Sequence, residues 1–274
     1  MYSLINKIYE RNNDSKTVFP NKRQAEDFIG QLFDVLFINT DNKYTSRAAF
    51  ETEFQYLGII FNKLLPGTQL DADIEDNWEV FSEELSTLYN ASILDANAIL
   101  EFDPAANSLE EVLHTYPGFY AIAIHRIAHY LWQKNARELA RVFAEHVHSK
   151  TGIDIHPGAR IGQGFAIDHG TGIVIGESTQ IGNNVKIYQG VTLGALSVAK
   201  ENAKVKRHPT IQDDVIIYSN ATILGGNTLI GRGSIIGGNV WLTHSVPSNS
   251  VVFHQIEIKV KDNNPFPEPI NYVI

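Results

Sequence analysis

The second half of this chain repeats a large aliphatic residue every six positions, with a few interruptions. The thirteen repeating positions are Ile155, Ile161, Ile167, Ile175, Ile181, Ile187, Leu193, Ile211, Ile217, Ile223, Ile230, Ile236 and Leu242. Six of them are followed by glycine, which permits a corner because it has no Cβ atom. Neither an α-helix nor an ordinary strand keeps a period of six, whereas a parallel β-helix does. A β-sandwich would alternate apolar and polar residues instead, so the repeat favours a parallel β-helix.

The first half of the chain has a different period. Between residue 21 and about residue 150, apolar residues recur at the spacing of amphipathic helices. Turn-forming sequences such as "LPGTQLDAD" and "DPAANS" separate these segments. The stretch "FYAIAIHRIAHYLW" is apolar almost all round, which is typical of a helix buried between others or in a subunit contact. The sequence therefore predicts an N-terminal helical domain followed by a β-helix.

The composition limits the available chemistry. The chain has no cysteine, which excludes disulfides, thiolate nucleophiles and thiolate metal ligands. A formal net charge of −9 argues against a nucleic-acid partner, which requires a basic face. No apolar stretch reaches the length of about 18 residues that a membrane span needs, and the first residues lack the apolar core of a secretory leader. We therefore expect a cytoplasmic protein without a membrane partner.

The longest interruption of the repeat is basic. Its sequence, "GALSVAKENAKVKRHP", carries Lys200, Lys204, Lys206 and Arg207 in an otherwise acidic protein. Extra residues in a solenoid form loops, often on the binding side, and a basic loop suits a phosphate-bearing partner. A solvated loop whose lysines only add solubility explains the lysines equally well. The pairing of Arg207 with His208 favours a functional role.

A second interruption places an acid beside an imidazole. In "FAIDHGTGIVIGE" the position after the aliphatic residue is Asp168 instead of glycine, and His169 follows. A lone histidine in a turn is more often a solvated surface residue than a catalytic one. The repeat also slips by two residues here, which indicates a loop.

The order of these motifs resembles one protein family. "DIHPGARIGQG", "DHGTGIVIGE", "GVTLG" and "RHP" followed by "ATILGG" are similar to the motifs of serine O-acetyltransferases, and the resemblance covers roughly residues 103–247. It implies an α+β fold: an all-helical domain over 1–150, a left-handed parallel β-helix catalytic domain over 151–250 and a C-terminal tail over 251–274. It also implies acetyl transfer from acetyl-CoA to L-serine in cysteine biosynthesis, without a metal ion. A homotrimer, or a hexamer formed through the helical domains, is implied as well.

His169 is the candidate general base. A serine hydroxyl is a poor nucleophile at neutral pH, and an imidazole can take its proton as the hydroxyl attacks the thioester. The resemblance assigns to Asp154 the carboxylate that holds the second ring nitrogen and stabilises the imidazolium. A backbone N–H near Gly194 is the expected donor to the oxyanion of the tetrahedral intermediate.

The substrate amino acid has to be held at both ends. Arg207 offers a planar fork of donors for the carboxylate, in agreement with the family pattern. The resemblance places Asp103, from the helical domain, and Asp168 at the ammonium group, with His208 beside the substrate. For Asp103 a turn or helix cap is the competing explanation, because Asp-Pro is common there.

The chain departs from the family pattern around the coenzyme. Gly194 and Ala195 stand where family members commonly carry a glycine-rich loop, and Lys206 replaces the aspartate before Arg207. The usual "G-x-P-A" after the last coil is missing. The predicted coenzyme contacts, Gly194, Ala195 and Lys206, fall in this altered loop.

The family implies two regulatory contacts. Its C-terminal peptide ends in isoleucine and inserts into O-acetylserine sulfhydrylase, so the tail "NPFPEPINYVI", ending at Ile274, is predicted to dock there. A frayed terminus is the alternative, since prolines interrupt this segment. Feedback inhibition by L-cysteine at the serine site is also implied.

Other functions fit parts of the sequence. The nearest is another hexapeptide-repeat acetyltransferase with a different hydroxyl or amine acceptor, such as a sugar. A γ-type carbonic anhydrase shares the solenoid but needs three histidines around a metal ion, and its close histidine pair is missing. A solenoid that serves only as an oligomerising scaffold is a third possibility. The histidines interpreted as structural or surface residues are His125, His129, His156 and His244.

Overall fold

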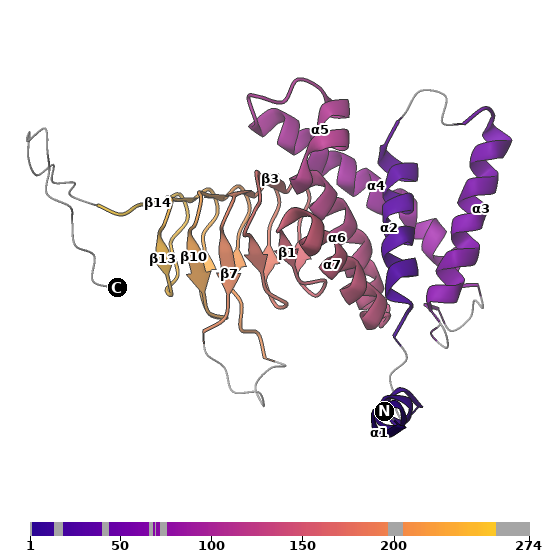
Figure 1. Ribbon diagram of the computed structural model, residues 1–274. Helices are drawn as coiled ribbons and strands as arrows, with labels where there is room; N and C mark the ends of the chain where they lie inside the picture. Colours follow the sequence, from indigo (N-terminus) through magenta and orange to yellow (C-terminus); the bar gives the residue numbers. More distant parts are fainter. Residues whose placement is uncertain are drawn as a thin grey trace, which may run out of the picture.

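The computed structural model describes residues 2–13, 19–39, 44–65, 68, 70–71, 76–196 and 205–255. In these ranges a group of helices is followed by a long prism of short strands (Figure 1). The helices are α1 (Tyr2–Asn13), α2 (Lys22–Phe37), α3 (Arg47–Leu64), α4 (Asn77–Phe102), α5 (Leu109–Thr115), α6 (Pro117–Gln133) and α7 (Arg137–Thr151). α1, which the apolar spacing did not predict, lies apart from the other helices in Figure 1. None of the helices in the described ranges is long and apolar enough to cross a membrane.

Side-chain caps fix where most of these helices begin. Four helices follow a residue whose side chain accepts a hydrogen bond from a backbone N–H of the first turn: Asn21, Ser46, Asp76 and Ser108. α6 begins instead with Pro117, at a position where the missing N–H has no helical partner to lose. Tyr116 is therefore the residue at which the chain enters α6.

The strands form three parallel sheets. Sheet A contains β1 (Asp154–Ile155), β4 (Val174–Ile175), β7 (Thr192–Gly194), β10 (Thr222–Leu224) and β13 (Trp241–Leu242). Sheet B contains β2 (Arg160–Ile161), β5 (Gln180–Ile181), β8 (Thr210–Ile211) and β11 (Leu229–Ile230). Sheet C contains β3 (Ala166–Asp168), β6 (Lys186–Tyr188), β9 (Ile216–Ile217), β12 (Ile235–Ile236) and β14 (Val251–Val252). Each strand pairs in parallel with its equivalent in the neighbouring coil, so the sheets are the three sides of a prism.

The repeating aliphatic residues line the inside of this prism. In sheet A, for example, Ile155, Ile175 and Leu193 lie in register in successive coils, and all three are buried. Eleven of the thirteen repeat positions are buried, while Ile161 and Leu242 are partly buried against the same core. Such stacking stabilises a solenoid because no coil can bury its apolar side chains alone. The predicted fold class, a helical domain followed by a parallel β-helix, is confirmed.

A buried ion pair fixes the helices to the first coil of the β-helix. Asp95 on α4 accepts hydrogen bonds from Arg126 Nε (2.5 Å) and Nη2 (2.7 Å) and from the Phe165 N–H (2.9 Å). Arg126 on α6 also donates to the carbonyl oxygen of Gly162 at 2.8 Å. Burial raises the pKa of Asp95, although Arg126 opposes this effect. Removing one partner of a buried pair costs about 3–5 kcal/mol, so this contact holds α4 and α6 in a defined place on the β-helix.

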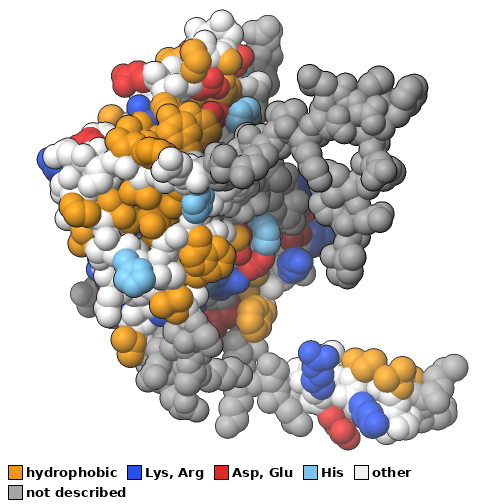
Figure 2. All heavy atoms as spheres, turned by 90° about the vertical axis from the view of Figure 1, so that its left-hand side faces the viewer, with side chains coloured by type: hydrophobic (Ala, Val, Ile, Leu, Met, Phe, Trp, Pro, Cys, Tyr) orange, Lys and Arg blue, Asp and Glu red, His pale blue; other side chains and the backbone are white. Residues whose placement is uncertain are grey.

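The far end of the β-helix is exposed and apolar. Trp241, Val251 and Phe253 are 64%, 64% and 71% exposed. Figure 2, which faces this end, shows apolar side chains gathered on it. Lys200, Lys204 and the predicted docking tail that ends at Ile274 lie outside the described residues.

Candidate active site

An irregular corner of the prism carries His169. The corner connects β3 in sheet C with β4 in sheet A, and it is two residues longer than the next one, between Tyr188 and Thr192. His169 has a φ of +56° and Gly170 a φ of +91°. A left-handed conformation is unfavourable for a residue with a Cβ atom and recurs at functional sites. The longer corner leaves the imidazole outside the prism, where 73% of its side chain is exposed.

Two carboxylates and a tyrosine accompany His169, and we call Asp103, Tyr116, Asp168 and His169 the acidic corner. Asp168 ends β3, with its Oδ1 atom 3.7 Å from His169 Nε2. Asp103 follows α4; its Oδ2 atom accepts a 2.7 Å hydrogen bond from the Tyr116 hydroxyl, and its Oδ1 atom accepts one of 2.8 Å from the Ala105 N–H. These two bonds, with a smaller effect of the His169 charge, lower the pKa of Asp103. The Asp103 carboxylate in turn raises the pKa of Tyr116 to about 12, so Tyr116 remains a hydrogen-bond donor.

Close packing of α6 on β3 brings Tyr116 to this corner. Gly118, in the first turn of α6, lies so near β3 that a Cβ atom there would be 2.5 Å from the carbonyl oxygen of Ile167. A larger residue would push α6 away from β3, and Tyr116, two residues earlier, would move with it. The glycine of "TYPG" was the available sequence signal for this contact, and Tyr116 was not recognised as a site residue from the motifs.

Asp154 lies one coil away from His169. It opens β1 and pairs with Val174, the first residue after the corner, and its side chain is half-buried. In the described part of the chain no hydrogen bond or ion pair joins Asp154 to His169, whose carboxylate partner is Asp168. The assignment of Asp154 to the second ring nitrogen of His169 therefore stays a prediction.

A second cluster occupies the corner between sheets A and B, and we call Glu177, Ser178, Arg207 and His208 the basic corner. Arg207 Nη2 lies 2.5 Å from Glu177 Oε2. Burial by itself would raise the pKa of Glu177, but the Arg207 hydrogen bond and nearby positive charges outweigh it and leave the pKa lowered. Ser178 Oγ accepts hydrogen bonds from the backbone N–H groups of Arg207 (2.9 Å) and His208 (3.1 Å). Gly176 makes room for this arrangement, because a Cβ atom there would lie 2.0 Å from the His208 ring.

His208 is neutral at physiological pH. Burial, together with the charge of Arg207, lowers its pKa to about 4. Its Nδ1 atom accepts a hydrogen bond from the Ser178 N–H at 3.1 Å and lies 2.9 Å from Ser178 Oγ. Nδ1 therefore carries the lone pair and Nε2 the proton. In this form His208 can donate a hydrogen bond to a ligand, whereas it is poorly suited to act as a general base.

The basic corner contains residues that the motif comparison did not single out. Glu177 and Ser178 directly follow "GIVIG", so their place in the repeat was a usable signal. His156, interpreted from the sequence as structural, lies close to this corner. Burial, followed by the charge of Arg141, lowers the pKa of His156 to about 4, and its ring packs on Trp132 with 4.9 Å between centroids.

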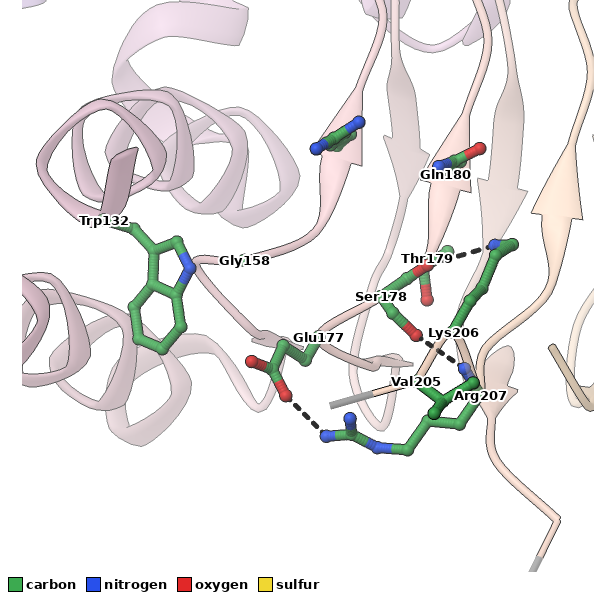
Figure 3. A pocket seen from close by; sticks show the side chains of 10 residues that line it. Trp132, Gly158, Glu177, Ser178, Thr179, Gln180, Val205, Lys206 and Arg207 are labelled. Atoms are coloured by element: carbon green, nitrogen blue, oxygen red, sulfur yellow. Dashed lines mark hydrogen bonds and ion pairs between the residues drawn. The ribbon is translucent and has the colours of Figure 1, made fainter. Parts of the chain in front are cut away.

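A cavity of about 350 Å³ opens beside the basic corner (Figure 3). Trp132, at the end of α6, stands on one side of it, and Arg207 points toward Glu177 on another. Lys206, one of the predicted coenzyme contacts, lines this cavity. The other two predicted contacts are not among the residues lining the cavity. Gly194 is the last residue of β7 in sheet A, and Ala195 follows it.

A single chain does not bring the two corners together. The acidic corner joins sheets C and A, while the basic corner joins sheets A and B. Within the described ranges no hydrogen bond or ion pair connects them. In one chain the whole width of sheet A lies between the corners of His169 and Arg207, so the predicted grouping of these two residues around one substrate requires a neighbouring subunit and stays a prediction. The described residues also contain no group of three or more histidine, cysteine or acidic side chains suited to a metal ion.

The parallel β-helix of six-residue repeats places the chain among hexapeptide-repeat proteins, and an exposed histidine beside carboxylates fits the acyltransferases of this class. Known proteins agree with this class. Over 179 residues the chain is 54% identical to the plasmid serine acetyltransferase of Synechococcus elongatus, a match that covers 64% of this chain but only 56% of that protein. It is 50% identical over 158 residues to the serine acetyltransferase of Bacillus subtilis, covering 58% of this chain and 70% of the relative. No protein-family model matches the chain.

Solved structures extend the likeness to both halves of the chain. Serine acetyltransferase isoform 3 of Entamoeba histolytica, in complex with cysteine, has a TM-score of 0.72 and 34% identity, covering 91% of this chain and 88% of that one. The serine acetyltransferase of Neisseria gonorrhoeae, in complex with serine, has a TM-score of 0.59 and 28% identity, covering 87% of this chain and 97% of that one. The chain belongs to the serine acetyltransferase family.

Proposed function

We propose that the chain transfers the acetyl group of acetyl-CoA to the hydroxyl of L-serine, releasing CoA and O-acetyl-L-serine for cysteine biosynthesis. This proposal rests on the acidic corner, where an outward-facing imidazole lies beside carboxylates from both halves of the chain. An imidazole can deprotonate a hydroxyl as it attacks, and carboxylates bind an ammonium group. Membership of the family supports the same reaction, and one similar protein has been solved with serine bound.

His169 is the proton carrier in this reaction. It takes the proton of the serine hydroxyl while the hydroxyl oxygen attacks the thioester carbonyl. The tetrahedral intermediate then collapses, the C–S bond breaks, and the imidazolium returns the proton to the leaving sulfur of CoA. Asp168, 3.7 Å from His169 Nε2, stabilises the imidazolium charge, and Asp154 is assigned to the other ring nitrogen.

The amino acid is bound by residues from two subunits. The ammonium group binds between Asp103 and Asp168, whereas the guanidinium for the carboxylate belongs to the other corner. A trimer with its axis parallel to the prism would set the acidic corner of one subunit against the basic corner of the next and complete three equivalent sites. There Arg207 binds the carboxylate, and neutral His208 donates its Nε2 proton to the substrate or the oxyanion. Pairing of trimers into hexamers through the helical domains is part of the same proposal.

Acetyl-CoA is the proposed co-substrate, with contacts from Gly194, Ala195 and Lys206 and an oxyanion donor near Gly194. L-cysteine is proposed to compete with L-serine, because it carries the same ammonium and carboxylate groups. Two similar proteins have been solved with cysteine bound, which supports this competition.

Docking of the C-terminal tail into O-acetylserine sulfhydrylase is also proposed. A variant that lacks Ile274 and still binds the sulfhydrylase as tightly as the full chain would contradict it.

Release of CoA from acetyl-CoA tests the proposed reaction. We expect L-serine to support release, and a panel of sugars and other amines not to do so. Faster release with a member of the panel than with L-serine would favour another acetyltransferase of the same fold. Absence of release with every acceptor would favour a scaffold, and unchanged release after His169→Ala substitution would place the active site elsewhere in the protein.

A further inference from the structure

An aromatic contact joins the two halves of the chain directly beside the acidic corner. Phe102 is the last residue of α4 and Tyr188 is the last residue of β6, and their ring centroids lie 5.4 Å apart in an edge-to-face arrangement. Phe102 directly precedes Asp103 in the chain. Tyr188 is the register partner of Asp168 in the neighbouring coil. Each of the two carboxylates proposed for the substrate ammonium group therefore has one ring of this pair as an immediate neighbour.

A second side chain of β6 also contacts the Phe102 ring. Lys186 and Tyr188 are two residues apart on this strand, so they project from the same face of sheet C. The Lys186 Nζ atom lies over the Phe102 ring, 4.6 Å from its centroid. A cation over an aromatic face and an edge-to-face ring pair each have a preferred geometry. Together these two contacts restrict where the end of α4 can lie on β6.

The following coil restrains Tyr188 in turn. Tyr218 follows β9, and its ring stacks on the Tyr188 ring with 4.9 Å between centroids and 16° between planes. Burial, followed by the neighbouring Tyr218, raises the pKa of Tyr188. The carboxylates of Asp168 and Asp103 raise this pKa further, so the hydroxyl stays protonated and lies within electrostatic reach of both.

The spacing of the two carboxylates needs support from both halves of the chain. Two carboxylates that face one ammonium group repel each other while the site is empty. The hydrogen bonds that hold the Asp103 carboxylate come from Tyr116 and the Ala105 N–H, which belong to the helical half. The contact between Phe102 and Tyr188 connects the same segment to the β-helix. It therefore adds a restraint on the distance from Asp103 to the strand that precedes His169.

We propose that Phe102 and Tyr188 are positioning residues that set the spacing between Asp103 and Asp168 and so determine how tightly the substrate ammonium group is bound. This inference rests on the proposed function, which assigns both carboxylates to the ammonium group. The two rings act through the carboxylates and not on the hydroxyl or the thioester. A change in their contact therefore alters the binding of L-serine and leaves the chemical step largely unchanged.

Substitution of Tyr188 separates the ring from the hydroxyl. An aromatic pair contributes enough to change a dissociation constant by about threefold to tenfold, so Tyr188→Leu should raise Kd and KM for L-serine by this factor. The value of kcat should stay within about twofold of wild type. Calorimetric titration with L-serine measures Kd, and the CoA-release assay measures KM and kcat. Tyr188→Phe keeps the ring and should bind L-serine as the wild type does; equal weakening in Tyr188→Phe and Tyr188→Leu would overturn the proposal.

A double-mutant cycle tests whether the two rings act through their contact. Phe102→Leu should raise Kd for L-serine by a factor similar to that of Tyr188→Leu. The two substitutions together should raise it no further than one of them alone, because either one removes the same contact. If the two effects multiplied instead, the rings would act independently and the proposed mechanism would be wrong.

Tyr130→Leu is the matched control for these variants. The Tyr130 ring is also half-buried, lies 5.9 Å from the ring of Phe81 and has the Lys134 Nζ atom 5.8 Å from its centroid. It is about 20 Å further along α6 than Tyr116. Tyr130→Leu should lower Tm about as much as Tyr188→Leu does and leave Kd for L-serine unchanged.

Two outcomes distinguish this inference from the proposed reaction. Equal losses of L-serine binding in Tyr130→Leu and Tyr188→Leu would mean that Tyr188 acts only through stability, which would overturn the inference. A wild-type protein that binds L-serine without acetylating it would refute only the reaction, since Kd still reports the effect of the aromatic contact.

Discussion

The acidic and basic corners of the prism place similar side chains in opposite environments. At the acidic corner the imidazole of His169 is exposed, and the carboxylate of Asp103 is held by a tyrosine hydroxyl. At the basic corner the imidazole of His208 is only 8% exposed and neutral, and the guanidinium of Arg207 is held by Glu177. One corner thus offers a base and negative charge, while the other offers hydrogen-bond donors and positive charge.

The difference supports the proposal that each corner is half of a binding site for an amino acid. A zwitterion needs anions for its ammonium group and a cation for its carboxylate, and neither corner provides both. Each half is organised within its own chain by a contact that the motifs alone did not reveal. When subunits assemble, the side chains of both corners are already ordered, so association does not include the entropic cost of ordering them.

The largest effect is expected from removing the base of the acidic corner. Loss of a general base lowers the rate by about 10²–10⁴-fold, so His169→Ala should lower kcat by this factor with a small change in KM for L-serine. Thiol detection of released CoA measures both constants. His244→Ala, at an exposed position outside both corners, is the control and should leave kcat unchanged. If the His169→Ala enzyme kept more than a tenth of the wild-type kcat, the roles assigned to His169 and His208 would be wrong.

Mixed assemblies test whether the corners belong to different subunits. His169→Ala and Arg207→Ala should each be nearly inactive alone. If each site takes its acidic corner from one subunit and its basic corner from the next, random mixing restores about a quarter of the sites. Co-expression of the two variants with separate affinity tags, followed by the CoA-release assay, measures this recovery. Activity no higher than that of the parent variants would place both corners of a site in one chain.

A smaller effect is expected from the tyrosine that orients Asp103. Tyr116→Phe removes a hydrogen bond to a charged group, which contributes about 1.5–3 kcal/mol. We expect KM for L-serine to rise by about tenfold while kcat changes little, since the bond positions the ammonium site and not the base. The pKa of Asp103 should also rise, so the acid limb of kcat/KM should move to higher pH. Steady-state kinetics across pH measures both effects.

Tyr120→Phe is the matched control for that experiment. Tyr120 lies one turn further along α6, and its hydroxyl is 3.3 Å from His146 Nε2, away from the acidic corner. Its removal should leave KM for L-serine and the acid limb unchanged. Equal effects of the two substitutions would mean that Tyr116 acts only through the stability of α6.

The smallest expected effect is a pH dependence of stability that originates at the basic corner. The folded-state pKa of His208 and of His156 is about 4, below the usual 6.5. Between these values the unfolded chain binds more protons than the folded chain, so stability is lost as pH falls from 6.5 through about 4. Thermal unfolding across this range should show Tm falling, by about 2–4 °C for each kcal/mol lost. His208→Gln should flatten this dependence, and His244→Gln should not; an unaltered slope in His208→Gln would contradict the buried neutral imidazole.

Much of the site could be predicted from the sequence because its residues fall in short motifs. Asp168 and His169 interrupt the repeat where the corner is longer, and Arg207 and His208 close the basic loop. Tyr116 and Asp103 are thirteen residues apart with α5 between them, so their hydrogen bond depends on how α5 and α6 pack. Glu177 and Arg207 are thirty residues apart, and their pairing depends on the return of the basic loop to the neighbouring coil. α1 was missed because its short amphipathic pattern precedes the region where helical spacing is sustained.

The six-residue period by itself determined the β-helix. A period is a local property, and each coil can bury its aliphatic residue only by stacking on the same residue of the next coil. The motifs on that repeat likewise identified the family to which the chain belongs. Only the tertiary structure decided that His169 and Arg207 occupy different corners, since this depends on how many residues each side of the prism takes up. It also decided that His208 is neutral while His169 is exposed, because burial is a property of the packed molecule and not of the residue.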